Sequence, residues 1–103
     1  MRIFFSVVIV LLSFGFKVSA QQIMAQLLDK ADKQPIAYAN IGILGSDMGT
    51  NSDDNGNFSI NIGKEQEDQI ISISLVGYQT YKVKVTEFEN QLKSNSNKLY
   101  LQK

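Results

Sequence analysis

The fold is decided by residues 58–85, which read FSINIGKEQEDQIISISLVGYQTYKVKV. Apolar residues alternate with polar ones in three short runs, which begin at Phe58, Ile71 and Tyr81. A period of two is typical of strands that bury one face, and the Gly and polar residues between the runs are typical of turns. The stretch therefore predicts three short strands, with Phe58 in the core and Tyr81 on the apolar face of the last strand.

The same pattern extends to both sides of this stretch. Strands are predicted at residues 23–28 and 37–44, with Ala39, Ile41 and Ile43 on one face of the second. A short strand is predicted near Met48, and residues 99–101 form a closing strand. Turn residues every eight to twelve positions are typical of an all-β sandwich.

A short helix is predicted after the last of the three runs. Thr86–Glu89 has the form of a capping box, and Phe88 and Leu92 lie four residues apart, which indicates one or two helical turns. No predicted helix is long enough to cover a sheet, so two sheets must cover each other. The predicted fold class is an all-β, seven-strand antiparallel β-sandwich.

Composition limits the chemistry that this chain can perform. The 103 residues suffice for one domain and include no His and no Cys, so Ser-His, Cys-His and catalytic zinc sites are excluded. The chain also contains no glycine-rich phosphate-binding motif. Ten basic residues balance ten acidic ones, which gives no basic face for nucleic acid. We therefore expect no enzyme activity, no cofactor and no metal site.

The first twenty residues indicate export. Arg2 precedes an uncharged run from Ile3 to Phe16, and Val18-Ser19-Ala20 supplies the small residues that a signal peptidase recognises. The run is shorter than the roughly 20 apolar residues that span a bilayer. We predict a cleaved signal peptide at residues 1–20 and a mature domain at residues 21–103. A retained N-terminal anchor is the alternative.

A series of motifs resembles the carboxypeptidase-regulatory-like family. The motifs are Pro-x-x-Tyr-Ala-Asn, Gly-Thr, Asp-x-x-Gly-x-Phe and Gly-Tyr, in that order. The residues that carry them are Asp29, Pro35, Tyr38, Ala39, Asn40, Gly45, Gly49, Thr50, Asp53, Gly56, Phe58, Gly77 and Tyr78.

The resemblance implies a transthyretin-like β-sandwich without peptidase activity. The family is common in Bacteroidetes-type bacteria, often ahead of the plug of TonB-dependent outer-membrane receptors. It therefore implies a module of the bacterial envelope, which we expect in the periplasm, with the outer membrane or secretion as the alternative. The expected partner is another envelope protein, such as a receptor in the outer membrane, which would bind at a sheet edge. Lys82 and Lys84 either guard such an edge or form an ordinary solvated face.

Several motif residues have simple physical interpretations. Tyr38 is expected to bury its ring while its hydroxyl finds a partner. Asn40, unusual in a strand, is expected to bond backbone groups, and a ligand contact is the alternative. Gly49 and Gly56 are expected to adopt positive φ in turns, with Asp53 accepting backbone N–H groups. Gly77-Tyr78 is expected to form a strand bend with Tyr78 packed over it.

Two ligand hypotheses remain at this point. Residues 51–56 match the first half of an EF-hand loop, but the twelfth position is Ile62, which favours a hairpin turn over calcium. Tyr38, Tyr78, Tyr81 and Tyr100 offer stacking platforms for a glycan, and of these Tyr100 alone alternates outward, from Leu99 and Leu101. Carbohydrate binding, with Asn40 and Tyr100 as possible contacts, is therefore the alternative to protein binding.

Overall fold

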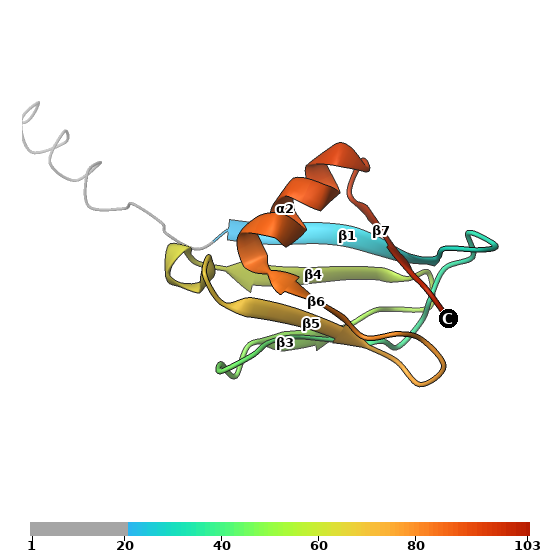
Figure 1. Cartoon of the computed structure of the whole chain (residues 1–103), viewed down its shortest axis with the longest axis horizontal. Helices are drawn as coiled ribbons and strands as arrows, with labels where there is room; N and C mark the ends of the chain where they lie inside the picture. Colours follow the sequence, from blue (N-terminus) through green and yellow to red (C-terminus); the bar gives the residue numbers. More distant parts are fainter. Residues whose placement is uncertain (1–20) are drawn as a thin grey trace, which may run out of the picture.

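The computed structural model describes residues 21–103, which form two packed β-sheets and one α-helix (Figure 1). The predicted signal peptide, residues 1–20, lies outside the described residues. One sheet has the order β4-β1-β7 and the other β3-β2-β5-β6. The strands are β1 (Gln21–Asp29), β2 (Asn40–Ile43), β3 (Gly49–Asn51), β4 (Asn57–Ile62), β5 (Ile70–Ser74), β6 (Tyr81–Lys84) and β7 (Lys98–Leu101). The seven-strand β-sandwich is thus confirmed.

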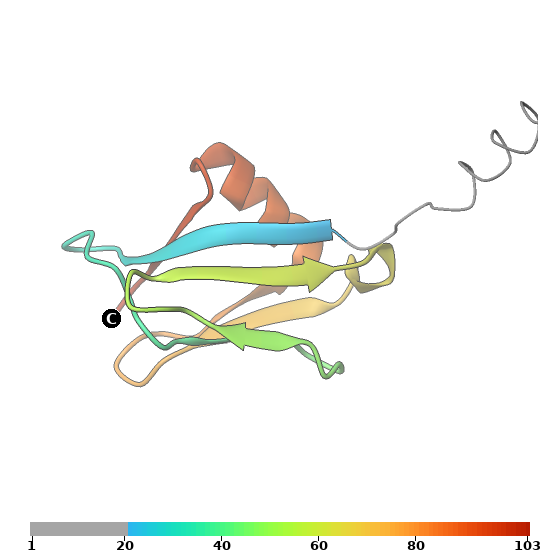
Figure 2. The ribbon, with the colours of Figure 1, turned by 180° about the vertical axis from the view of Figure 1, so that it is seen from behind.

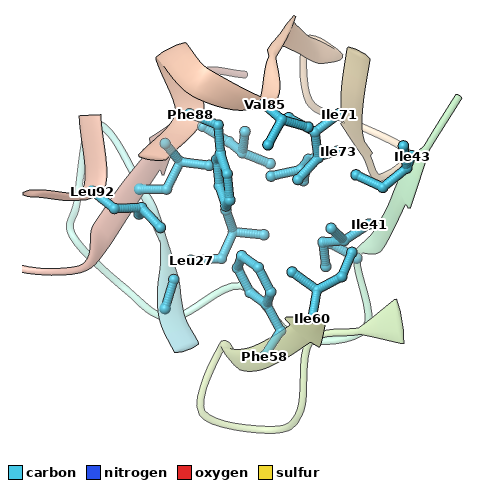
Figure 3. Close-up of a cluster of buried hydrophobic side chains, with 14 of the residues drawn as sticks. Leu27, Ile41, Ile43, Phe58, Ile60, Ile71, Ile73, Val85, Phe88 and Leu92 are labelled. Carbon is cyan, nitrogen blue, oxygen red and sulfur yellow. The ribbon is translucent and has the colours of Figure 1, made fainter. Parts of the chain in front are cut away.

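The alternating residues form the core between the sheets (Figure 3). Phe58, Ile60 and Ile62 of β4 are all buried, as are Ile71 and Ile73 of β5. The polar residues between them turn outward, because successive side chains of a strand lie on opposite faces. The predicted core face of these strands is therefore confirmed.

The strand β2 is shorter than the sequence predicts. Ala39, Ile41 and Ile43 share a buried face as expected, but the strand begins only at Asn40. Tyr38 has a φ of 63°, which interrupts the extended conformation that residues 37–44 were expected to share. Before it, Pro35 forms an isolated bridge with Leu28 at the end of β1.

One strand pairing is parallel, which corrects the prediction of a wholly antiparallel sandwich. Strand β7 pairs with β1 in parallel, with Leu27 opposite Leu99 and Asp29 opposite Leu101. The remaining pairings, which involve β1 with β4 and the whole four-stranded sheet, are antiparallel. The parallel pair arises because α2 (Val85–Ser94) carries the chain from β6 in one sheet to β7 in the other.

The helix α2 is longer and more important than the sequence analysis predicts. It spans ten residues and places Val85, Phe88 and Leu92 in the core, where the rings of Phe88 and Phe58 stack 6.5 Å apart (Figure 3). The expected capping box at Thr86 is wrong, because the N-cap is Lys84 and makes no side-chain cap bond. The helix contacts β5, β6 and β7, so the two sheets do not cover each other alone. It connects β6 to β7 along the chain and contacts both strands.

Candidate functional site

Asp29 and Tyr78, two of the motif residues, meet at one end of the sandwich. The Asp29 side chain is 3 % exposed, and its Oδ1 accepts the backbone N–H groups of Ala31 (2.7 Å) and Asp32 (3.2 Å). The Tyr78 hydroxyl donates to Asp29 Oδ2 at 2.8 Å, and Lys103 Nζ lies 3.7 Å from the same oxygen. Asp29 thus joins the end of β1 to the turn between β5 and β6 and to Lys103.

These contacts change the acidity of both motif residues. The Tyr78 hydroxyl, followed by the two backbone N–H groups and the charge of Lys103, holds the pKa of Asp29 below its ordinary value of 3.8, although burial opposes this. The same hydrogen bond raises the pKa of Tyr78. Both Asp29 oxygens already have partners, so this carboxylate serves the fold.

The motif around Pro35 and Ala39 is held by Ser52, a residue that the sequence analysis missed. Ser52 is 2 % exposed, and its hydroxyl accepts from Ala39 N–H (2.9 Å) and donates to the Ile36 carbonyl (2.8 Å). Its backbone carbonyl accepts from Tyr38 N–H at 2.9 Å. No signal in the sequence separates Ser52 from the polar turn in which it lies.

Tyr38 is placed differently from the prediction. Its side chain is 64 % exposed, so the expectation of a buried ring is wrong. The expected partner for its hydroxyl is present, since the hydroxyl donates to Asp54 Oδ1. The ring is exposed because the positive φ of Tyr38 turns this residue out of the line of β2.

Asn40 bonds a side chain instead of the expected backbone groups. Its Oδ1 accepts from Asn51 Nδ2 at 2.7 Å across the β2–β3 pair, and Asn51 Nδ2 also lies 3.2 Å from the Ala39 carbonyl. Thr50 lies beside Asn51 in β3, opposite Ile41. These contacts pin β3 to β2.

The glycines of the motifs have two different roles. Gly56 has a φ of +79°, as expected, and a Cβ there would lie 2.4 Å from the Leu27 carbonyl oxygen. Gly49 lies in β3 without a positive φ, so that expectation is wrong. Gly49 is explained by close approach, because a Cβ there would lie 3.0 Å from the Ile41 oxygen. Gly45 and Gly77 lie in turns.

The polar turn at residues 51–56 uses its carboxylate for local bonding. Asp53 Oδ1 accepts the backbone N–H groups of Asn55 and Asn57, both at 2.9 Å. This is the hairpin-turn arrangement that the sequence analysis favoured over calcium. Within residues 21–103, no group of three or more His, Cys, Asp or Glu side chains is arranged to hold a metal ion.

The strand β4 forms one edge of the three-stranded sheet and can be seen beside β1 in Figure 2. Leu27 N–H donates to the Gly56 carbonyl at 2.7 Å, and the pairing continues with Ala25 opposite Phe58. Since bonded pairs alternate along an antiparallel ladder, the backbone polar groups of Ser59 and Asn61 point away from β1. A shallow groove of about 690 Å³ extends from this edge across β1 to the start of β7; its lining includes Thr50, Asn57, Ser59, Met24, Gln26 and Lys98.

The other edges of the two sheets are short or protected. Strand β3 has only three residues. Strand β6 carries the exposed residues Lys82 and Lys84, so both lysines lie on an edge strand, as one of the two interpretations of the sequence requires. The last strand, β7, lies next to α2 and is joined to the start of β6 by a 2.7 Å bond from Gln79 N–H to the Gln102 carbonyl. Strand β4, with six residues, is therefore the longest edge strand without a charged residue, and β3 contacts it.

A second groove, the α2–β7 groove, has a volume of about 560 Å³ and contains Tyr100. Its lining includes Lys30, Tyr81, Asn90, Gln91, Ser94 and Tyr100. The Tyr81 hydroxyl donates to Gln91 Oε1, and burial, with a smaller effect of Glu87, raises the pKa of Tyr81 to about 12. Lys33 Nζ lies 4.9 Å from the centre of the Tyr100 ring. The two residues proposed as ligand contacts, Asn40 and Tyr100, thus lie on different sheets.

Comparisons with known proteins agree with this architecture. Residues 23–102 match the family model of the CarboxypepD_reg-like domain. No curated protein and no solved structure matches the chain. Among the described residues, 21–103, none of the helices has the length and apolar character needed to cross a bilayer. Because the family match runs from β1 through β7, the chain belongs to the CarboxypepD_reg-like domain family.

Proposed function

We propose that this chain is a non-catalytic binding module of the bacterial envelope, which receives an extended segment of a partner protein as an added strand at β4. The observation that carries the proposal is the open edge of β4, where the backbone groups of Ser59 and Asn61 point away from β1. Main-chain hydrogen bonds along such an edge supply affinity in strand addition.

The composition of this edge supports the proposal. Natural edge strands are commonly protected by Lys, Pro or a bulge. The six residues of β4 include no charge and no proline, and neither β3 nor the part of β1 from Gln21 to Leu28 carries a charge. Depletion of charge is typical of the centre of a protein interface. Two lysines, Lys82 and Lys84, protect the edge strand β6 instead, which makes β4 the preferred edge.

The role in the envelope rests on the N-terminal sequence and on the family. The uncharged run from Ile3 to Phe16 and the small residues before Gln21 support export. The regulatory-like family supports a module without catalytic activity. We place the mature protein in the periplasm, with an envelope protein, such as an outer-membrane receptor, as the partner.

A proline at the open edge tests the proposal. In Ser59→Pro, the lost N–H points away from β1, so the β1–β4 ladder keeps its hydrogen bonds while an added strand loses its donor and meets the proline ring. The matched control is Lys82→Pro, since Lys82 N–H points away from β5 in the same manner. Both purified variants are used with the wild type for affinity purification from the envelope fraction.

An envelope protein should be retained by the wild type and by Lys82→Pro and lost from Ser59→Pro. Because proline can perturb a strand, Ser59→Lys provides a second variant that protects the edge with a charge. Circular dichroism verifies that each variant is folded. Equal retention of the partner by folded Ser59→Pro and Ser59→Lys would show that β4 does not receive it.

A further inference from the structure

The α2–β7 groove combines aromatic rings with hydrogen-bonding side chains. Its lining comes mainly from α2 and β7, whereas β4 lies at the other edge of the sheet that contains β7. Tyr81 and Tyr100 come from two different sheets and line the same groove. Its volume of about 560 Å³ falls within the range of small-molecule sites. The groove is therefore large enough for a ligand that is independent of the partner strand.

The wall formed by α2 consists of polar side chains. Asn90, Gln91, Ser94 and Asn95 all line the groove. The Tyr81 hydroxyl donates to Gln91 Oε1, which fixes the orientation of this amide and leaves its Nε2 hydrogens available as donors. A dense set of neutral donors and acceptors is suited to a ligand that has many hydroxyl groups.

The opposite wall, formed by β7, adds a backbone N–H and a backbone C=O that form no hydrogen bond with β1. Asn97 and Leu101 of the β7 segment accept from Gln26 N–H (2.9 Å) and Lys30 N–H (2.8 Å) of the β1 segment. Because such bonds alternate along a parallel strand, the N–H and C=O of Tyr100 point away from β1, to the side where α2 lies. Convergent backbone groups of this kind fix the orientation of bound small molecules.

The charge of the groove indicates a neutral ligand. Among its lining residues, Lys30 and Glu87 carry charges of opposite sign. The nearby Lys33 ammonium covers one face of the Tyr100 ring and donates to the Lys30 carbonyl at 2.7 Å, so a ligand would stack on the other face of this ring. Aromatic rings provide flat apolar surface beside a polar group, which suits a sugar ring with its apolar face and its hydroxyls.

We propose that the α2–β7 groove binds a neutral oligosaccharide, with Tyr100 as the ring platform and the amides of Asn90 and Gln91 as hydrogen-bonding partners of the sugar hydroxyls. Tyr81 is a positioning residue, which acts by holding Gln91. This site is separate from the β4 edge, so either activity can exist without the other.

Oligosaccharide titration of the mature chain tests the proposal. The probes are cellohexaose, maltohexaose and chitohexaose, with hexagalacturonate as the charged counterpart. Tyrosine fluorescence reports binding directly, because the chain contains no Trp. Tyr100→Ala and Asn90→Ala should each weaken binding by about tenfold or more. Tyr38→Ala, which removes an exposed tyrosine outside the groove, is the matched control and should bind like the wild type.

We expect at least one neutral hexasaccharide to bind, and the charged one to bind more weakly. Asn90 is exposed on α2 and tolerates alanine, so this variant stays informative if Tyr100→Ala fails to fold. The proposal is overturned if none of the neutral probes binds, if hexagalacturonate binds as tightly, or if Tyr38→Ala lowers affinity as much as the groove variants. Tyr81→Phe should reduce affinity without unfolding the chain, which isolates its positioning role.

Discussion

At the scale of single residues, Ser52 shows how a small polar group organises a motif. It is nearly fully buried, and its hydroxyl satisfies one donor and one acceptor of the segment from Ile36 to Ala39. A buried backbone group that loses its partner costs free energy, since it has already been removed from water. Ser52 therefore stabilises the approach of the chain to β2, including the outward turn at Tyr38.

Ser52→Ala should lower the free energy of unfolding by about 1–3 kcal/mol, because Ala39 N–H and the Ile36 carbonyl both lose a partner. Urea unfolding measures the change. Ser72→Ala, on the half-exposed outer face of β5, is the control and should stay within about 0.5 kcal/mol of the wild type. Equal effects of the two substitutions would mean that the hydrogen bonds of the Ser52 hydroxyl do not contribute to the free energy of unfolding.

The residues that could be predicted were those whose role follows from their own chemistry. Phe58 was expected in the core, and Gly56 and Asp53 were expected to shape a turn; the structure has all three in these roles. Ser52 and the exposed ring of Tyr38 were not predictable. Their environments depend on how the segment before β2 crosses the polar turn, and this contact between distant segments leaves no periodic pattern in the sequence.

At the scale of elements, α2 shows why a correct pattern gave an incomplete prediction. Val85 continues the alternation of Tyr81 and Val83, so it reads as the end of a strand. It also stands three residues before Phe88 and seven before Leu92, which is the spacing of one helix face. The sequence at Val85 thus fits both a strand and a helix. In the structure Val85 is the first residue of α2, where its side chain is fully buried in the core.

The parallel direction of β7 relative to β1 also results from α2, and the sequence did not predict it. Its alternation predicts a strand but gives no direction relative to β1. That direction depends on α2 crossing from one sheet to the other. Strands β4, β5 and β6 were predictable because their patterns are local, whereas the pairing of β7 depends on the path of the whole chain.

Phe88→Ala should destabilise the protein by about 3–5 kcal/mol, because Phe88 is fully buried and stacks on Phe58. This is a large part of the roughly 4–12 kcal/mol expected for a domain of this size. Thermal and urea unfolding measure the loss. Phe88→Leu should cost much less, and Lys93→Ala on the exposed face of α2 should change little. A mild effect of Phe88→Ala would mean that α2 does not complete the core.

At the scale of the whole molecule, one buried carboxylate connects segments that lie far apart in the chain. Asp29 contacts the turn after β1, Tyr78 before β6 and Lys103 after β7. With no Cys in the sequence, such noncovalent contacts take the place that disulfides have in many small exported domains. The stability of the fold should therefore depend on the charge of this group.

Acid should weaken the wild type more than a variant that lacks this charge. The pKa of Asp29 is lowered in the folded chain, mainly by the Tyr78 hydroxyl, so its contribution is complete above the ordinary value of 3.8 and is lost as the pH falls through the lowered value. Asp29→Asn should be less stable than the wild type at neutral pH, and the difference should shrink in acid. Urea midpoints across a pH series measure it.

The exposed Asp47→Asn is the control for this series and should follow the wild type at each pH. Tyr78→Phe, which removes the main partner of the carboxylate, should behave like a weaker form of Asp29→Asn. A constant gap between wild type and Asp29→Asn at all pH values would show that the ionised form of Asp29 is not what stabilises the fold.

The uncharged edge at β4 also has a consequence for how a cell must produce this protein. An uncharged edge strand that pairs with a segment of a partner protein can also pair with the same strand of a second copy, when the protein concentration is high and the partner is scarce. Overproduction of this protein without its partner should therefore yield fibrous aggregates. Co-expression with the partner, or the substitution Ser59→Lys, should prevent this aggregation.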